Sequence, residues 1–233
     1  DAEGRVVLPG FIDSHTHLVF GGYRPEEFVW RMQGDSYMSI MERGGGIINT
    51  VRATREASFD ELKEKAEWYI DVMSRMGVTT VEGKSGYGLD KETEIKQLEV
   101  MKAINEDPMR KVDIATTFLG AHAVPTEYKG REDEYIDFLI EEMMLLIQEK
   151  GLAEHCDIFC EKGVFTVEQS RRLLQAAKER GFGVKIHADE IVSFGGAELA
   201  GKLQALSADH LLHASDAGIQ AMADNHVVAT LLP

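Results

Sequence analysis

From residue 58 onward, short apolar segments with the two-residue period of strands alternate with segments that have the period of helices. This alternation is typical of a parallel sheet covered by helices, because parallel strands need long crossover connections. An earlier apolar segment at 11–13 predicts a first, buried strand after the bend at Pro9-Gly10. Strands are expected at 11–13, 79–82, 112–119, 156–160, 183–187, 206–211 and 227–232, and helices at 37–43, 58–77, 91–105, 132–150, 166–180, 196–203 and 215–225.

Polar and titratable residues follow the carboxyl ends of these strands, which is where active sites lie in a (β/α)8 TIM barrel. The pattern predicts α/β architecture of this kind with about seven of the eight strands, and a doubly wound open sheet is the alternative. The last expected strand is almost wholly apolar, as a buried parallel strand should be. We expect residues 1–233 to form a single catalytic barrel domain without its last strand, and to fold poorly alone because two long edges stay unpaired.

The charge balance limits the partners of the protein. Forty acidic residues against 25 basic ones give a net charge of −15, which repels nucleic acid and anionic membranes. A small anionic substrate therefore requires a local cationic pocket. The apolar runs are far shorter than the ~20 residues of a membrane-spanning helix, and no signal peptide is visible, so a cytoplasmic location is expected.

The two cysteines lie four positions apart in an expected strand, Cys156 and Cys160. Four strand residues span about 13 Å, which is beyond the reach of a disulfide. Buried thiols in a reducing compartment are therefore expected.

Two histidines, His15 and His17, come directly after the first expected strand. Residues two apart on a strand point to the same face, so both imidazoles are placed to bind one divalent ion. Two histidines packed at a strand end are the alternative. His187 closes the 183–187 strand and is expected to be the third ligand, leaving a position where water is activated. Glu190 is expected to carry protons, and His210 to hold or deprotonate that water; His155, His213 and His226 are interpreted as ordinary histidines.

The stretch 8–17 (LPGFIDSHTH) resembles the first-strand motif of the amidohydrolase superfamily, metal-dependent hydrolases built on a (β/α)8 barrel. Further runs, in the same order along the chain, resemble the imidazolonepropionase family of that superfamily. They are 44–47 (GGGI), 50–55 (TVRATR), 84–89 (KSGYGL), 120–125 (GAHAVP), 159–165 (FCEKGVF) and 187–190 (HADE).

The resemblance implies hydrolysis of 4-imidazolone-5-propanoate to N-formimidoyl-L-glutamate in histidine degradation, with one zinc or iron ion. It also implies a fourth ligand, an aspartate beyond residue 233, and a flanking β-rich domain contributed by both termini; we further expect a homodimer. The matching positions are His15, His17 and His187 for the metal, Arg24, Tyr37, Tyr87, His122 and Glu190 for the substrate, and Glu190 and His210 for catalysis.

Two alternatives remain at this point. One is a different cyclic amidase or deaminase of the same superfamily. The group of Arg24, Tyr87 and His122 favours a substrate with a carboxylate and so argues against a neutral base. The other is a metal-binding protein without turnover.

Lys84 follows an expected strand, and we expect an unmodified amine there rather than a carbamate that bridges two metals.

Overall fold

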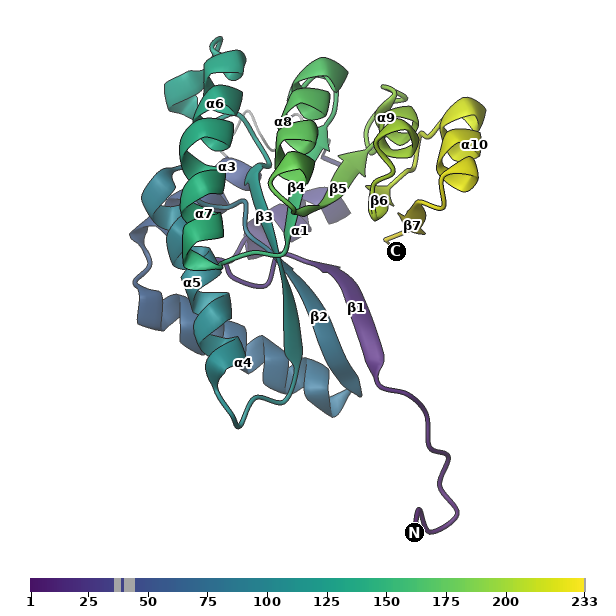
Figure 1. Cartoon of the computed structure of the whole chain (residues 1–233). Coiled ribbons are helices and arrows are strands. Elements are labelled where there is room, and N and C mark those ends of the chain that lie inside the picture. The colour runs from purple at the N-terminus through teal and green to yellow at the C-terminus, as the bar shows by residue number, and fades with distance from the viewer. Residues whose placement is uncertain (36–38, 40–44, 233) are drawn as a thin grey trace.

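The computed structural model describes residues 1–35, 39 and 45–232. Within them, seven parallel strands form one sheet in the order of the sequence (Figure 1). A doubly wound sheet reverses its strand order near the middle, so the sequential order excludes that alternative. The strands are β1 (Phe11–Thr16), β2 (Val78–Lys84), β3 (Asp113–Ala121), β4 (His155–Cys160), β5 (Gly183–Ala188), β6 (Ser207–His210) and β7 (Val228–Thr230).

The sheet curls until strands far apart in its order face each other. Nδ1 of His15, on β1, lies 2.7 Å from Oδ2 of Asp209, on β6. Four strands, β2 to β5, lie between these two in the sheet order, yet the two side chains meet in the interior. The sheet is therefore a nearly closed barrel, and the predicted TIM-type (β/α) fold is confirmed.

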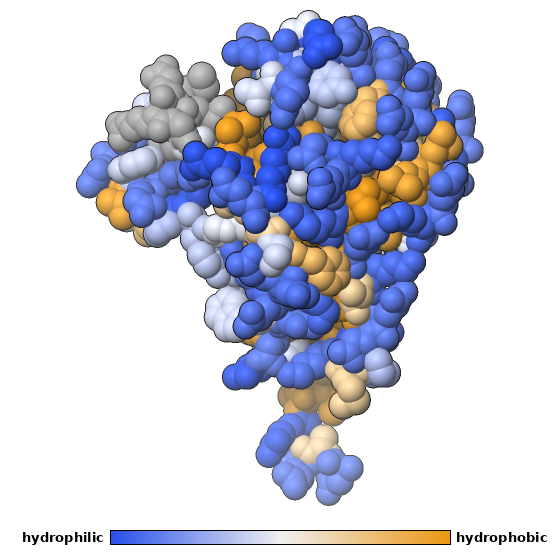
Figure 2. All heavy atoms as spheres, turned by 90° about the vertical axis from the view of Figure 1, so that its left-hand side faces the viewer, coloured by the Kyte–Doolittle hydropathy of each residue, from blue (hydrophilic) through white to orange (hydrophobic). Residues whose placement is uncertain are grey.

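Helices cover the outside of the barrel, and several begin at caps that the sequence encodes. Ser58 accepts a hydrogen bond from the Glu61 amide in a capping box, and Thr166 pairs with Gln169 in the same way. The face in Figure 2 is mostly hydrophilic, as expected where helices meet solvent. The helices are α1 (Pro25–Met32), α3 (Ile47–Glu56), α4 (Phe59–Arg75), α5 (Lys91–Glu106), α6 (Glu132–Phe138), α7 (Met144–Lys150), α8 (Val167–Glu179), α9 (Gly196–Leu203) and α10 (Asp216–Asp224).

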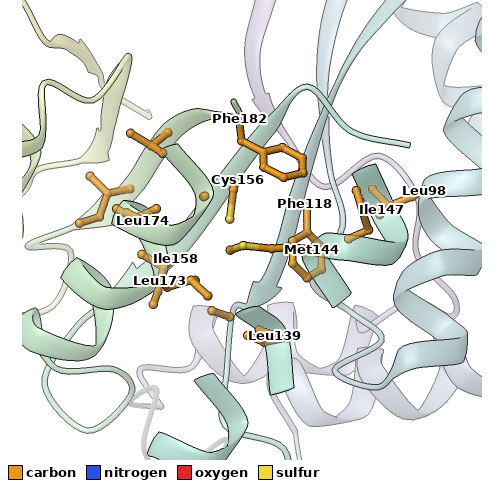
Figure 3. Packing of buried hydrophobic residues seen from close by; sticks show 14 of the residues in the cluster. Leu98, Phe118, Leu139, Met144, Ile147, Cys156, Ile158, Leu173, Leu174 and Phe182 are labelled. Atoms are coloured by element: carbon orange, nitrogen blue, oxygen red, sulfur yellow. The ribbon is translucent and has the colours of Figure 1, made fainter. Parts of the chain in front are cut away.

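The core lies between the middle strands and their helices. Phe118 of β3 and Ile158 of β4 pack with Met144 of α7 and Leu173 of α8, all fully buried (Figure 3). Cys156 is part of this cluster, and both cysteines are free and buried, as predicted.

Three expectations need correction. The helix expected at 132–150 is divided by a π-helical turn, η2 (Leu139–Met143), and a short 3-10 turn, η1 (Thr126–Tyr128), precedes it. Strand β2 extends to Lys84, so this lysine lies inside the barrel wall rather than in the following loop. The edge strands β1 and β7 are far more exposed than predicted, because each pairs with one neighbour only; Ile12 is 70% and Val228 61% exposed.

The helix expected at 37–43 falls almost wholly outside the described residues, as does Tyr37. In the part of the chain that is described, no helix combines the length and apolar character needed to cross a membrane.

Candidate active site

Five histidine rings gather at the carboxyl ends of the strands. His15 comes from β1, His187 from β5 and His210 from β6, while His17 directly follows β1 and His122 directly follows β3. Ring centroids lie 4.8 Å apart for His15 and His187, 5.1 Å for His15 and His210, and 4.5 Å for the stacked pair His17 and His122. The parallel sheet brings them together, because all its strands end at the same rim of the barrel.

The three histidines predicted as metal ligands belong to this cluster. Their ring centroids lie 5.4 Å (His15–His17), 4.8 Å (His15–His187) and 5.7 Å (His17–His187) apart. Three imidazoles around one tetrahedral zinc ion have centroids about 5 Å apart, so these spacings fit. Among the described residues, histidine nitrogens within 4.8 Å of one another form two sets that share His187: one with His15 and His210, and one with His17 and His122. The predicted trio is divided between these two sets.

One ring nitrogen of each predicted ligand faces an oxygen atom. Nδ1 of His15 lies 2.7 Å from Asp209 Oδ2, that of His17 3.4 Å from the Ser85 carbonyl, and that of His187 2.9 Å from Asp157 Oδ2. These oxygens favour the proton on Nδ1 and leave Nε2 for an ion. Both ring nitrogens of His187 are buried without a well-aligned hydrogen bond among the described residues, although Nδ1 lies close to Asp157. The donor set therefore fits a divalent cation.

Burial favours the neutral form of four of these imidazoles. It lowers the pKa of His17 well below the ordinary value, and that of His15 as well, although the Asp209 hydrogen bond opposes the shift there. Burial, reinforced by the nearby His187, lowers the pKa of His122 and of His210 to about 3. Only a neutral imidazole binds a metal, so burial holds His15 and His17 in the form that can bind one.

A buried group of charges lies behind the histidines. Nζ of Lys84 is 2.7 Å from Asp157 Oδ2, 3.0 Å from Glu82 Oε1 and 3.2 Å from Asp209 Oδ2, and all four side chains are at most 5% exposed. Burial alone would lower the lysine pKa, but the three carboxylates outweigh it and raise it. A carbamate on Lys84 would add a negative charge among three others, so the amine remains our prediction.

Sequence reasoning missed all three of these carboxylates. Glu82, Asp157 and Asp209 lie inside strands β2, β4 and β6 and are buried. A carboxylate in the middle of a buried strand needs a charged or hydrogen-bonding partner. Their positions in expected strands could therefore have indicated a buried charged group.

Arg24 and Tyr87, predicted to bind substrate, line one pocket of about 190 Å³ beside His17. His122 stacks on His17, and its ring centroid lies 5.4 Å from that of Tyr87. Nη1 of Arg24 is 3.3 Å from Oε2 of Glu27, and the guanidinium remains partly exposed. The pocket places a cation and a phenol next to the histidine cluster; its other lining residues are Phe20, Gly22, Tyr23 and Thr50.

The loop that carries Tyr87 is fixed by a buried carboxylate that the sequence did not reveal. Glu94 accepts hydrogen bonds from the backbone N–H groups of Gly86, Gly88 and Leu89. Nδ1 of His122 in turn lies 3.0 Å from the Gly86 carbonyl oxygen. Glu94 thereby fixes the loop that carries Tyr87 and that His122 contacts.

Glu190 and His210, predicted as catalytic residues, face each other at the rim. Oε2 of Glu190 lies 3.6 Å from Nε2 of His210, and burial raises the pKa of Glu190. The loop after Glu190 is anchored, because Asp189 accepts hydrogen bonds from backbone N–H groups between Phe194 and Ala197. A partly buried carboxyl group that holds or releases a proton near the histidines is suited to acid–base chemistry.

Comparison with known proteins agrees with this geometry. The profile of the Amidohydrolase family matches residues 1–47. Among solved structures, the 5-methylcytosine deaminase of Klebsiella pneumoniae superposes with a TM-score of 0.70 at 16% identity, covering 98% of this chain and 55% of that one. A Xaa-Pro dipeptidase superposes with a TM-score of 0.60 over 95% of this chain. At such low identity these two share the fold alone with this chain.

The barrel and its strand-end histidines agree with the match of residues 1–47 to the Amidohydrolase family. Along all 233 residues the chain is 79% identical to the imidazolonepropionase of Phocaeicola vulgatus, 70% to that of Bacteroides thetaiotaomicron and 63% to that of Clostridium tetani. The chain is therefore similar to imidazolonepropionases along its whole length. It spans about half the length of these relatives, 55–56%.

Proposed function

We propose that the protein containing this chain hydrolyses 4-imidazolone-5-propanoate to N-formimidoyl-L-glutamate in histidine degradation, using one zinc or iron ion. The observation that carries the proposal is the histidine cluster beside the Arg24 pocket, in a chain 79% identical to an imidazolonepropionase. A deaminase or another cyclic amidase is the alternative. Arg24 favours a substrate with a carboxylate, which a neutral base lacks.

His15, His17 and His187 would hold the ion through Nε2. A bound divalent ion supplies Lewis acidity and lowers the pKa of water to near 7. The water oxygen bonds to the ring carbonyl carbon, the carbon–nitrogen bond of the ring breaks, and the departing nitrogen takes a proton. Glu190, whose pKa burial raises, carries that proton, and His210, whose Nε2 lies 3.6 Å from the Glu190 carboxyl group, stabilises charge on the carbonyl oxygen.

Arg24, Tyr87 and His122 would bind and orient the propionate. The planar guanidinium suits a two-point contact with a carboxylate, and it supplies local positive charge to a protein whose net charge is −15. Tyr37 joins this group in the proposal on the basis of its position in the family pattern. The same proposal places the reaction in the cytoplasm, where free thiols such as those of Cys156 and Cys160 stay reduced.

The decisive experiment is turnover by the full-length protein with imidazolone propionate, against 5-methylcytosine, guanine and hydantoin. Glu190→Gln should retain bound metal and lose kcat by at least about 100-fold, because the proton carrier is gone. Glu168→Gln, at a position whose side chain is 81% exposed, is the matched control. Full activity of Glu190→Gln would reject the catalytic assignment, and turnover of the neutral bases alone would reject the substrate.

Substrate binding is tested separately with Arg24→Lys. Loss of the two-point contact should cost about 1.5–3 kcal/mol of binding free energy, measured as a rise in KM. Arg31→Lys, on the exposed face of the same helix region, controls for the change of side chain. An unchanged KM in Arg24→Lys would show that the carboxylate binds elsewhere.

A further inference from the structure

Lys84 joins the carboxylates that contact two of the proposed metal ligands. Its Nζ lies 2.7 Å from Asp157 Oδ2 and 3.2 Å from Asp209 Oδ2. The same Oδ2 atoms lie 2.9 Å from Nδ1 of His187 and 2.7 Å from Nδ1 of His15. One ammonium group is thus connected to two imidazoles, on β5 and β1, through one carboxylate each.

We propose that Lys84 is a positioning residue, whose ammonium group holds Asp157 and Asp209 where they orient His187 and His15 toward the ion. This inference rests on the metal site of the proposed function. Groups behind metal ligands commonly set both ring orientation and affinity, although they never touch the metal.

Charge balance explains why the ammonium group is needed. Ligand oxygens of Asp157 and Asp209 lie within 4.8 Å of each other, and both carboxylates are fully buried. Two like charges at that distance in a buried site repel strongly. Without Lys84 at least one of the carboxyl groups would take up a proton or turn away, and its histidine would lose a fixed acceptor for Nδ1–H.

A second buried lysine supplies a matched control. Nζ of Lys185 lies 2.7 Å from Glu82 Oε2, and its side chain is 12% exposed. It therefore shares Glu82 with Lys84, but no ion pair joins it to Asp157 or Asp209 among the described residues. If buried positive charge alone mattered, both lysines would matter equally.

The experiment compares Lys84→Met with Lys185→Met in the full-length protein. Zinc affinity is measured by competition with a chelator, and the imidazole tautomers of the metal-free protein by ¹⁵N NMR. We expect Lys84→Met to raise the zinc Kd about 10- to 100-fold and to mix the tautomers of His15 and His187. Lys185→Met should change the Kd less than about threefold and leave the Nδ1–H tautomers in place.

Folding is controlled with the double variant Glu82→Gln/Lys84→Met, which removes one charge of each sign. It keeps Asp157 and Asp209 without their anchor, so its zinc affinity should also be weak, whereas Glu82→Gln alone should bind zinc nearly as tightly as wild type. Thr117 donates a hydrogen bond to Glu82 Oε1 at 2.6 Å, and the glutamine oxygen can still accept it.

Equal zinc affinity in Lys84→Met and Lys185→Met would overturn the inference. Tighter zinc binding in Lys84→Met would overturn it as well, because it would show that the ammonium group only repels the ion. Failure of the wild-type protein to bind metal or open the imidazolone ring would instead reject the proposed function. In that case the tautomers of the metal-free protein still decide whether Lys84 positions the histidines.

Discussion

Two lysines border the site, and burial has opposite outcomes for them. Lys65, on α4, lies over the rings of Phe20 and Tyr23, 3.6 and 3.7 Å from their centroids. Burial lowers its pKa to about 8, and no carboxylate pairs with it in the described ranges. Burial also acts on Lys84, but three carboxylates reverse the sign and raise its pKa. The environment of a buried ammonium group, rather than burial itself, decides whether it stays charged.

The difference extends to what each lysine supports. Lys84 is enclosed by strands β2, β4 and β6, so its ion pairs are part of the barrel interior. Lys65 donates a hydrogen bond to the Gly22 carbonyl and packs on the loop that leads to Arg24. We therefore expect loss of the interior contacts to affect folding, and loss of the loop contacts to affect substrate binding alone.

The largest effect is expected from Asp157→Asn, which breaks the interior group. Asparagine removes the carboxylate that faces both Lys84 and His187, and disrupting a buried ion pair should lower the free energy of unfolding by about 3–5 kcal/mol. Asp71→Asn is the control, because Asp71 pairs with Arg75 and Lys111 at the surface and should lose no more than about 1 kcal/mol. Urea unfolding of the metal-free protein measures both. Equal losses in the two variants would mean that the interior ion pairs contribute no more to the free energy of unfolding than surface ion pairs do.

A second effect concerns the reactivity of the two amines. Only a neutral amine is acylated, and a lysine with a pKa near 8 is about half neutral at pH 8. A lysine with the ordinary pKa of about 10.4 is then less than about 1% neutral. With limiting reagent at pH 8, Lys65 should react at least about tenfold faster than the reference compound Nα-acetyl-lysine amide, and Lys84 should not react. Labelling of Lys65 should rise up to about pH 8 and then level off. Peptide mass spectrometry measures the labelling of each lysine. Labelling of Lys65 no faster than the reference would contradict the lowered pKa.

Local patterns predicted most of the fold because most strands and helices carry a signal of their own. The capping box at Ser58 and the alternation of strands with helices depend on residues close in sequence, and both were found. Helices α1 and α3 were not predicted. Two unpaired edges were expected, but β1 and β7 were still expected to be buried, because an apolar sequence such as that of 227–232 carries no information about its neighbours.

The site was predictable only where a single residue type carries the chemistry. Histidines at strand ends pointed to a cluster, and the structure brings them together. Lys84 and Asp157, by contrast, are 73 residues apart, and their contact depends on the register of three strands. Sequence patterns do not give that register, so the charges that hold the histidines in place became visible only in the folded chain.

The smallest effect is expected from Lys65→Met, which keeps the apolar stem of the side chain and removes its charge. A cation over an aromatic ring at an exposed site contributes about 0.5–1 kcal/mol, and the loop it holds leads to Arg24. KM for imidazolone propionate should therefore rise about two- to fivefold while kcat stays the same, because Glu190 and His210 lie on other loops. Lys63→Met is the control, since Lys63 lies on the same helix and pairs with Glu67. Steady-state kinetics of the two variants measures both effects. A fall in kcat for Lys65→Met, or the same rise in KM for Lys63→Met, would show that the contact of Lys65 with Phe20 and Tyr23 does not position the pocket.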